Sequence, residues 1–133
     1  MRKIFFVIFI MTICAITGCQ NNQMYDLNDI NMRIKEGTLT NHSATIIIVD
    51  NSKKNNTYGE WFRIDKKENG KWKKLKIIND SFFNSIAYKI DENNELELEH
   101  NWESIYGKLS SGNYRLIKEV NNNKYISVDF TID

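Results

Sequence analysis

The alternation of apolar and polar residues is the feature that most restricts the fold of this chain. From residue 31 onward, apolar side chains recur mostly at every second position, the period of a β-strand. Residues 125–132 place Ile126, Val128, Phe130 and Ile132 on one face, and the β-branched run at residues 44–49 is typical of a strand covered on both faces. No segment has a convincing helical period, so the pattern predicts an all-β fold.

Polar turns separate the predicted strands at intervals of roughly ten residues. Asn69-Gly70 predicts a hairpin, and its return strand, residues 71–78, requires a bulge between Trp72 and Leu75 to restore the alternation. Further strands are predicted around Ile86, Tyr88 and Ile90, around Leu96, Leu98 and His100, and over residues 114–120. In total, about seven or eight strands predict one antiparallel β-sandwich.

A tyrosine corner is predicted near the C-terminal end. Leu109, two spacer residues, Gly112, one residue and Tyr114 have its spacing, and the tyrosine hydroxyl of such a corner bonds back to the backbone. We therefore expect structural roles for these three residues.

These segments together resemble a family of bacterial immunoglobulin-like domains found in secreted and lipid-anchored proteins. The resemblance rests on residues 37–41 with Ala44, Tyr58-Gly59 with Phe62, Gly70-Lys71-Trp72 with Leu75, and residues 102–115, where the motif residues are Trp102, Gly107, Leu109, Gly112 and Tyr114. It implies an immunoglobulin-like sandwich over residues 31–133 and a surface location. It implies no activity, because a fold does not determine a function.

The N-terminus has the layout of a lipoprotein signal peptide. Arg2 and Lys3 precede an apolar run over residues 4–16, which is shorter than the roughly 20 residues that span a bilayer. The run ends at Ile16-Thr17-Gly18-Cys19, which resembles the bacterial lipobox. We expect cleavage after residue 18, lipidation of Cys19, a flexible tether over residues 19–30, and a protein held at the extracytoplasmic face of the cell membrane.

Composition excludes some functions. Removal of Arg2 and Lys3 lowers the basic count from 18 to 16 against 17 acidic residues, so no nucleic acid partner is indicated. Once Cys14 leaves with the signal, Cys19 is the only cysteine, so no intramolecular disulfide can form.

Residues with catalytic potential are few. His42 is interpreted as a solvated loop residue and His100 as a partly buried structural residue. Glu95, Glu97 and Glu99 share one face of a strand, where lysines of a neighbouring strand, Lys71, Lys73 or Lys76, would balance them. The acidic turn at residues 91–95 lacks the spacing of a calcium loop. We therefore expect no enzyme activity, metal or cofactor.

The leading functional hypothesis is a membrane-anchored, non-catalytic binding module for an envelope or surface protein. Trp61 is predicted to face outward beside Tyr58, so these two residues form the candidate binding surface. The alternatives are a protective lipoprotein or hydrolase inhibitor, a structural spacer and, less favoured, a hydrolase using Glu97, Glu99 or His100.

Overall fold

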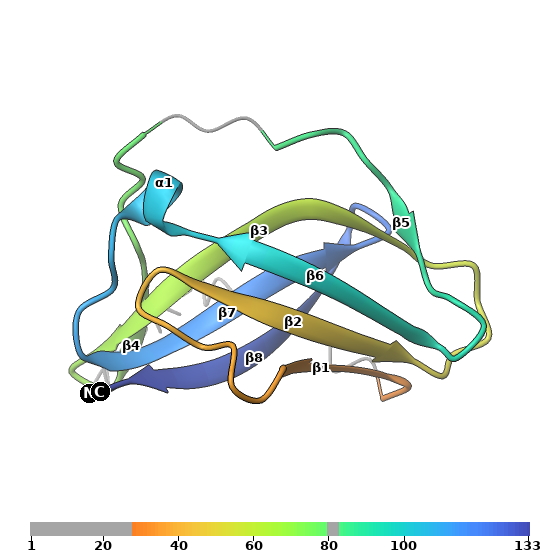
Figure 1. The fold of residues 1–133 in the computed structure, drawn as a ribbon, viewed down its shortest axis with the longest axis horizontal. Coiled ribbons are helices and arrows are strands. Elements are labelled where there is room, and N and C mark those ends of the chain that lie inside the picture. The colour runs from red at the N-terminus through yellow and green to blue at the C-terminus, as the bar shows by residue number, and fades with distance from the viewer. Residues whose placement is uncertain (1–27, 80–82) are drawn as a thin grey trace, which may run out of the picture.

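The computed structural model describes residues 28–79 and 83–133, which form two antiparallel β-sheets packed face to face (Figure 1). The predicted signal peptide, Cys19 and nearly all of the predicted tether lie outside these residues. The described part contains eight strands and one short helix. The prediction of an all-β antiparallel sandwich is therefore confirmed.

The smaller sheet has three strands in the order β1-β2-β6, with bounds Ile30–Ile34, Ser43–Asp50 and Glu95–Asn101. β2 is central, and its alternate residues Ala44, Ile46 and Ile48 are buried in the core. β1 begins at Ile30, the last residue of the predicted tether. Ile30 pairs with Asp50 of β2 in the antiparallel register.

The larger sheet has five strands, and its main path is β4-β3-β7-β8. The bounds are Thr57–Glu68 for β3, Lys71–Lys74 for β4, Gly112–Val120 for β7 and Lys124–Ile132 for β8. A two-residue strand, β5 (Tyr88–Lys89), pairs with the start of β3. The helix, α1 (Glu103–Tyr106), connects β6 to the segment that leads into β7.

The core lies between the sheets and is rich in aromatic side chains. Trp102 and Tyr58 are fully buried, and the ring of Tyr114 stacks on Phe130 with 5.6 Å between centroids. Phe62 and Ile64 face inward, as the alternation predicts. The other buried apolar members of the core are Met32, Ala44, Ile46, Ile48, Leu98, Ile105, Leu109, Leu116, Val120 and Ile126.

Two predicted strands differ from the structure. β4 ends at Lys74 and pairs with β3 without a bulge, and the Leu75 amide still donates to the Ile64 carbonyl at 3.1 Å before the chain leaves the sheet. The irregularity lies in β3, between Tyr58 and Phe62. The strand predicted around Ile86 is reduced to β5, and Ile86 is 46% exposed. Both differences fall where the chain runs between β4 and β5. Because that segment is not part of a sheet, the alternation of apolar residues there does not indicate which side chains face the core.

The two lateral sides of the sandwich are unlike. On one side β1 packs beside β8, so strands of both sheets meet. On the other side is β6, and within residues 28–79 and 83–133 no strand pairs with its outer edge. The helix of the described part is too short to cross a membrane.

Candidate interaction site

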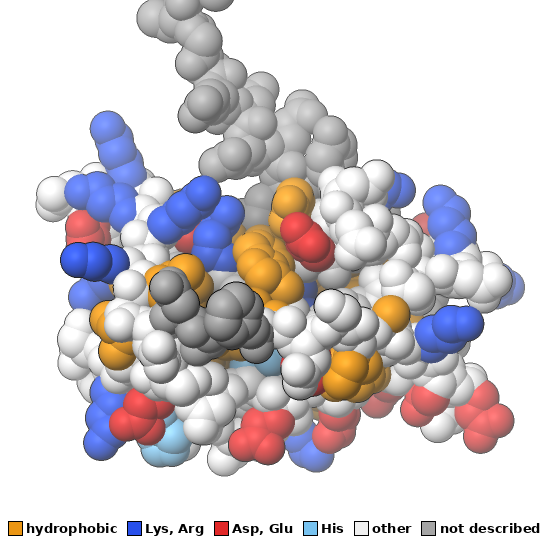
Figure 2. Space-filling model, turned by 90° about the horizontal axis from the view of Figure 1, so that it is seen from above, with side chains coloured by type: hydrophobic (Ala, Val, Ile, Leu, Met, Phe, Trp, Pro, Cys, Tyr) orange, Lys and Arg blue, Asp and Glu red, His pale blue; other side chains and the backbone are white. Residues whose placement is uncertain are grey.

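A groove runs along the outer edge of β6, between the two sheets. We call it the β6 groove; its volume is about 550 Å³. β3, β5, β6 and α1 supply its walls, and Figure 2 views the molecule from this side, with acidic side chains gathered along the lower border. Its lining consists of Glu60, Phe62, Phe83, Tyr88, Glu97, Leu98, Glu99, His100, Asn101, Ser104 and Ile105.

His100 forms part of the inner wall of the groove. Its side chain is 5% exposed, and its ring stacks on Phe62 with centroids 4.5 Å apart. This position agrees with a structural histidine on the inward face of β6. The alternating register of the strand, which also turns Leu98 inward, explains it.

Lys118 lies behind His100 and is completely buried. Its ammonium group donates to the carbonyl oxygens of Gly59 and Trp61, at 2.8 and 3.1 Å, and lies 3.2 Å from Nε2 of His100. The register of β3 against β7 is broken between Tyr58 and Phe62. The lysine therefore satisfies carbonyl groups in an irregular stretch of β3.

Burial sets the charges of this pair. It lowers the pKa of His100 to about 3, with a further lowering by the charge on Lys118. It also lowers the pKa of Lys118 to about 8, although Glu60 and Glu119 oppose the shift. At neutral pH the imidazole is neutral and accepts at Nε2 from the charged lysine, which places its proton on Nδ1.

Glu60 forms the rim of the groove beside β5. Its carboxylate accepts from the Tyr88 hydroxyl at 2.8 Å and from the Asn84 amide at 3.3 Å. The hydrogen bond to Glu60 raises the pKa of Tyr88. These two contacts tie β5 and the segment before it to β3.

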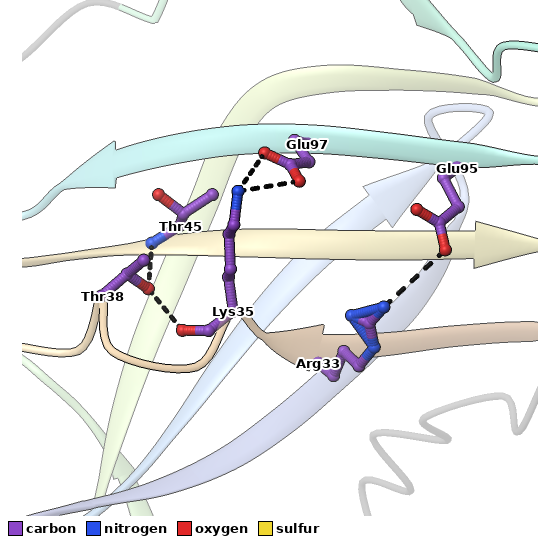
Figure 3. A network of polar contacts seen from close by, with 6 residues as sticks. All are labelled: Arg33, Lys35, Thr38, Thr45, Glu95 and Glu97. Carbon is purple, nitrogen blue, oxygen red and sulfur yellow. Dashed lines mark hydrogen bonds and ion pairs between the residues drawn. The ribbon is translucent and has the colours of Figure 1, made fainter.

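Two of the three glutamates of β6, Glu95 and Glu97, are paired across the smaller sheet (Figure 3). Lys35 Nζ lies 3.1 Å from both carboxylate oxygens of Glu97, and Arg33 lies 3.7 Å from Glu95. The prediction that Lys71, Lys73 or Lys76 would balance these acids is wrong. β4 belongs to the other sheet, where Lys73 pairs with Glu68 instead.

The motif residues near β7 lie together at one end of the sandwich. The Tyr114 hydroxyl donates to the Ser110 carbonyl at 2.6 Å, which is the hydrogen bond of a tyrosine corner. Trp102 Nε1 donates to the Asn41 carbonyl at 3.0 Å, and Leu109 is buried. Gly107 and Gly112 have φ angles of 78° and 156°, a region that favours glycine.

Trp72 lies on the outer face of the larger sheet, outside the core. The Arg115 guanidinium lies 4.2 Å from the centroid of its ring, and Lys67 Nζ lies 5.7 Å from it. Arg115 also donates two hydrogen bonds to Asp129. This tryptophan therefore packs against charged side chains on the outer face of the sheet.

The predicted binding surface at Tyr58 and Trp61 is wrong for Tyr58. Tyr58 has no exposed surface, and its hydroxyl donates to Asp50 at 2.8 Å. Burial, together with Asp50, raises the pKa of this tyrosine. Trp61 is on the opposite face, half-buried against Tyr125 at a centroid distance of 6.2 Å. The two residues lie three positions apart in β3, so the alternation of the strand turns them to opposite faces.

Other candidates have structural contacts. His42 is half-buried in the turn before β2, where its carbonyl accepts from the Trp102 amide at 3.0 Å. The Asp91 carboxylate accepts from the amides of Asn93 and Glu95, which closes the acidic turn. No group of three potential metal ligands was found among the described residues.

Sequence reasoning missed Lys118, Glu60 and the open edge of β6. A signal for Lys118 is present, because Tyr114, Leu116, Lys118 and Val120 alternate in one register, which turns the lysine inward. The role of Glu60 has no comparable signal, since its partners come from the segment before β5 and from β5 itself.

The fold and the groove define a small β-sandwich module whose contacts would run through a sheet edge or a face. The chain belongs to the bacterial Ig-like domain family, whose model matches residues 26–131. No curated protein and no solved structure gives a significant match.

Proposed function

We propose that the protein is a lipid-anchored, non-catalytic binding module on the extracytoplasmic face of the cell membrane. The observation that carries the proposal is the β6 groove, a recess along an open sheet edge in a fold that usually serves interactions. Its partner is an envelope or surface protein within reach of the tether.

The side chains around the groove favour binding over catalysis. His100 is held neutral against Lys118, while Glu97 is paired with Lys35. Glu97 and Glu99 alternate with His100 along β6, so they project from the opposite face of the strand. Among the described residues of β6, this arrangement gives no close pair of a carboxylate and an imidazole.

Support for the anchor comes from the sequence alone. The short apolar run and Gly18-Cys19 have the layout of a lipobox, and a diacyl group on Cys19 holds a protein firmly at a membrane. Metabolic labelling with radioactive palmitate tests this directly. We expect the label in the wild type and in Cys14→Ser, whose thiol lies within the removed signal, and no label in Cys19→Ser. Label retained in Cys19→Ser would refute the anchor.

Crosslinking in native membranes tests the binding role. We expect a defined protein to be captured by the wild type and lost with Cys19→Ala, because the anchor sets the location of the domain. Equal capture by both forms would show that anchoring is not part of the function. Turnover of a glycan or peptide substrate that disappears in His100→Gln or Glu99→Gln would overturn the non-catalytic assignment.

A further inference from the structure

The backbone groups of β6 that point away from β2 can be identified from the ladder. Asn94 O accepts from Asp50 N at 2.9 Å, and Trp102 N donates to His42 O at 3.0 Å. Hydrogen-bonded residues alternate along an antiparallel pair, so the even-numbered residues of β6 bond to β2. The odd-numbered residues direct their N–H and C=O groups outward.

The two ends of this outward row differ. At one end the backbone is engaged: Glu95 N donates to the Asp91 carboxylate at 3.0 Å, and Glu95 O accepts from Asp91 N. At the other end only the side chain of Asn101 is engaged, because its Oδ1 accepts from the first amide of α1. Between them lie Glu97 and Glu99, whose outward backbone groups have no backbone partner among the described residues. We call this stretch the open edge of β6.

The two sides of the open edge differ in chemistry. On the solvent-facing side of the smaller sheet, the side chains along this edge are carboxylates. Glu97 is about half exposed, and Glu99 is exposed without an ion pair among the described residues. Inward, the groove presents the side chains of Leu98 and Phe62 from the core, with Phe83 packed against them. A strand added at this edge would set alternate residues against acids and against apolar groups.

We propose that the open edge of β6 binds an extended segment of a partner protein in which basic and apolar residues alternate. The segment pairs its backbone with Glu97 and Glu99, places Lys or Arg beside their carboxylates, and buries its apolar residues in the β6 groove. The inference rests on the proposed function and names the partner's chemistry. A second copy of the chain fits poorly, because two β6 edges would bring glutamates together.

Synthetic octapeptides provide the test with the full-length lipidated protein in nanodiscs. An octapeptide of alternating Lys and Val should bind and shift the amide resonances of Glu97 and Glu99. An octapeptide of alternating Glu and Val should bind at least tenfold more weakly. N-methylation of alternate residues of the Lys and Val peptide should abolish binding, because the methyl groups remove the donors of one edge.

Charge reversal on the protein completes the test. Glu99→Lys should lower the affinity for the peptide of alternating Lys and Val at least tenfold. The matched change Glu36→Lys, in the exposed turn after β1, should alter that affinity less than twofold. Equal binding to Glu99→Lys, undiminished binding of the N-methylated peptide, or no binding at millimolar peptide would overturn the inference. Self-association of the wild type that is lost in Glu99→Lys would assign the edge to a second copy instead.

Failure here is distinguishable from failure of the proposed function. A membrane partner that is crosslinked equally well by Glu99→Lys and the wild type would leave the binding role intact and reject this edge. Loss of that partner in Glu99→Lys, with folding and palmitate labelling retained, would support both.

Discussion

Strand β7 carries two polar side chains into the sandwich, and they are satisfied in different ways. The hydroxyl of Tyr114 reaches a carbonyl four residues earlier in the chain. The ammonium of Lys118 reaches carbonyls 59 and 57 residues away and an imidazole 18 residues away. The first contact is a local motif, whereas the second exists only after β3, β6 and β7 have assembled.

Replacement of Lys118 should have the larger effect. Lys118→Ala removes buried methylenes, about 0.8 kcal/mol each, and leaves three acceptors without a donor, at about 1–3 kcal/mol each. Relief of the buried charge offsets part of this, so we expect a loss of about 4 kcal/mol in the free energy of unfolding, measured by urea denaturation. Lys118→Met, which keeps the methylenes, should lose about 2 kcal/mol. A Lys118→Met protein as stable as the wild type would show that the ammonium is dispensable.

Removal of the Tyr114 hydroxyl should cost less. In Tyr114→Phe the ring keeps its stacking on Phe130, and one neutral hydrogen bond is lost, at about 1–2 kcal/mol of unfolding free energy. Tyr125→Phe is the matched control, since its hydroxyl bonds to Glu119 at 3.1 Å on the outer face. Denaturation curves should show a smaller loss for the control. Equal losses would mean that the corner contributes no more than a surface contact.

The pH dependence of stability should reveal the buried, neutral state of His100. Its pKa falls from an ordinary 6.5 to about 3 on folding, so the unfolded chain binds the extra proton between these values. Stability from this group is complete above pH 6.5 and is lost as the pH falls toward 3, by at most about 1.4 kcal/mol per pH unit. Denaturation at several pH values should give a shallower dependence for His100→Gln. An unchanged slope would contradict the buried neutral imidazole.

The elements predictable from sequence are those whose information is local. The alternation over residues 125–132, the turn at Asn69-Gly70 and the spacing of Leu109, Gly112 and Tyr114 each lie within a dozen residues. Each corresponds to an element of the structure: β8, the turn between β3 and β4, and the corner before β7. Local propensity and turn chemistry are enough to define such elements.

The remaining features depend on which strands become neighbours. Glu97 pairs with Lys35 because β1 and β6 flank β2, and no alternation pattern reports that order. Tyr58 is buried because its side chain enters the core, where its hydroxyl donates to Asp50 of β2 in the other sheet, although its sequence neighbours indicate an exposed turn. The β6 groove exists only because β6 is an edge strand of the smaller sheet. Sheet order, rather than strand identity, is therefore what the sequence leaves open.

Removal of the surface ion pair between Lys35 and Glu97 should change the unfolding free energy least, which contrasts with the buried contacts of Lys118. Both side chains are about half exposed, and such pairs contribute roughly 0.2–1 kcal/mol. Glu97→Gln should lower the unfolding free energy by less than 1 kcal/mol, and 1 M sodium chloride should abolish the difference, since it shortens the screening length to about 3 Å. The loss caused by Lys118→Met should persist in the same salt, because the buried ammonium is not screened. A salt-sensitive loss at Lys118 would mean that solvent reaches the interior of the sandwich.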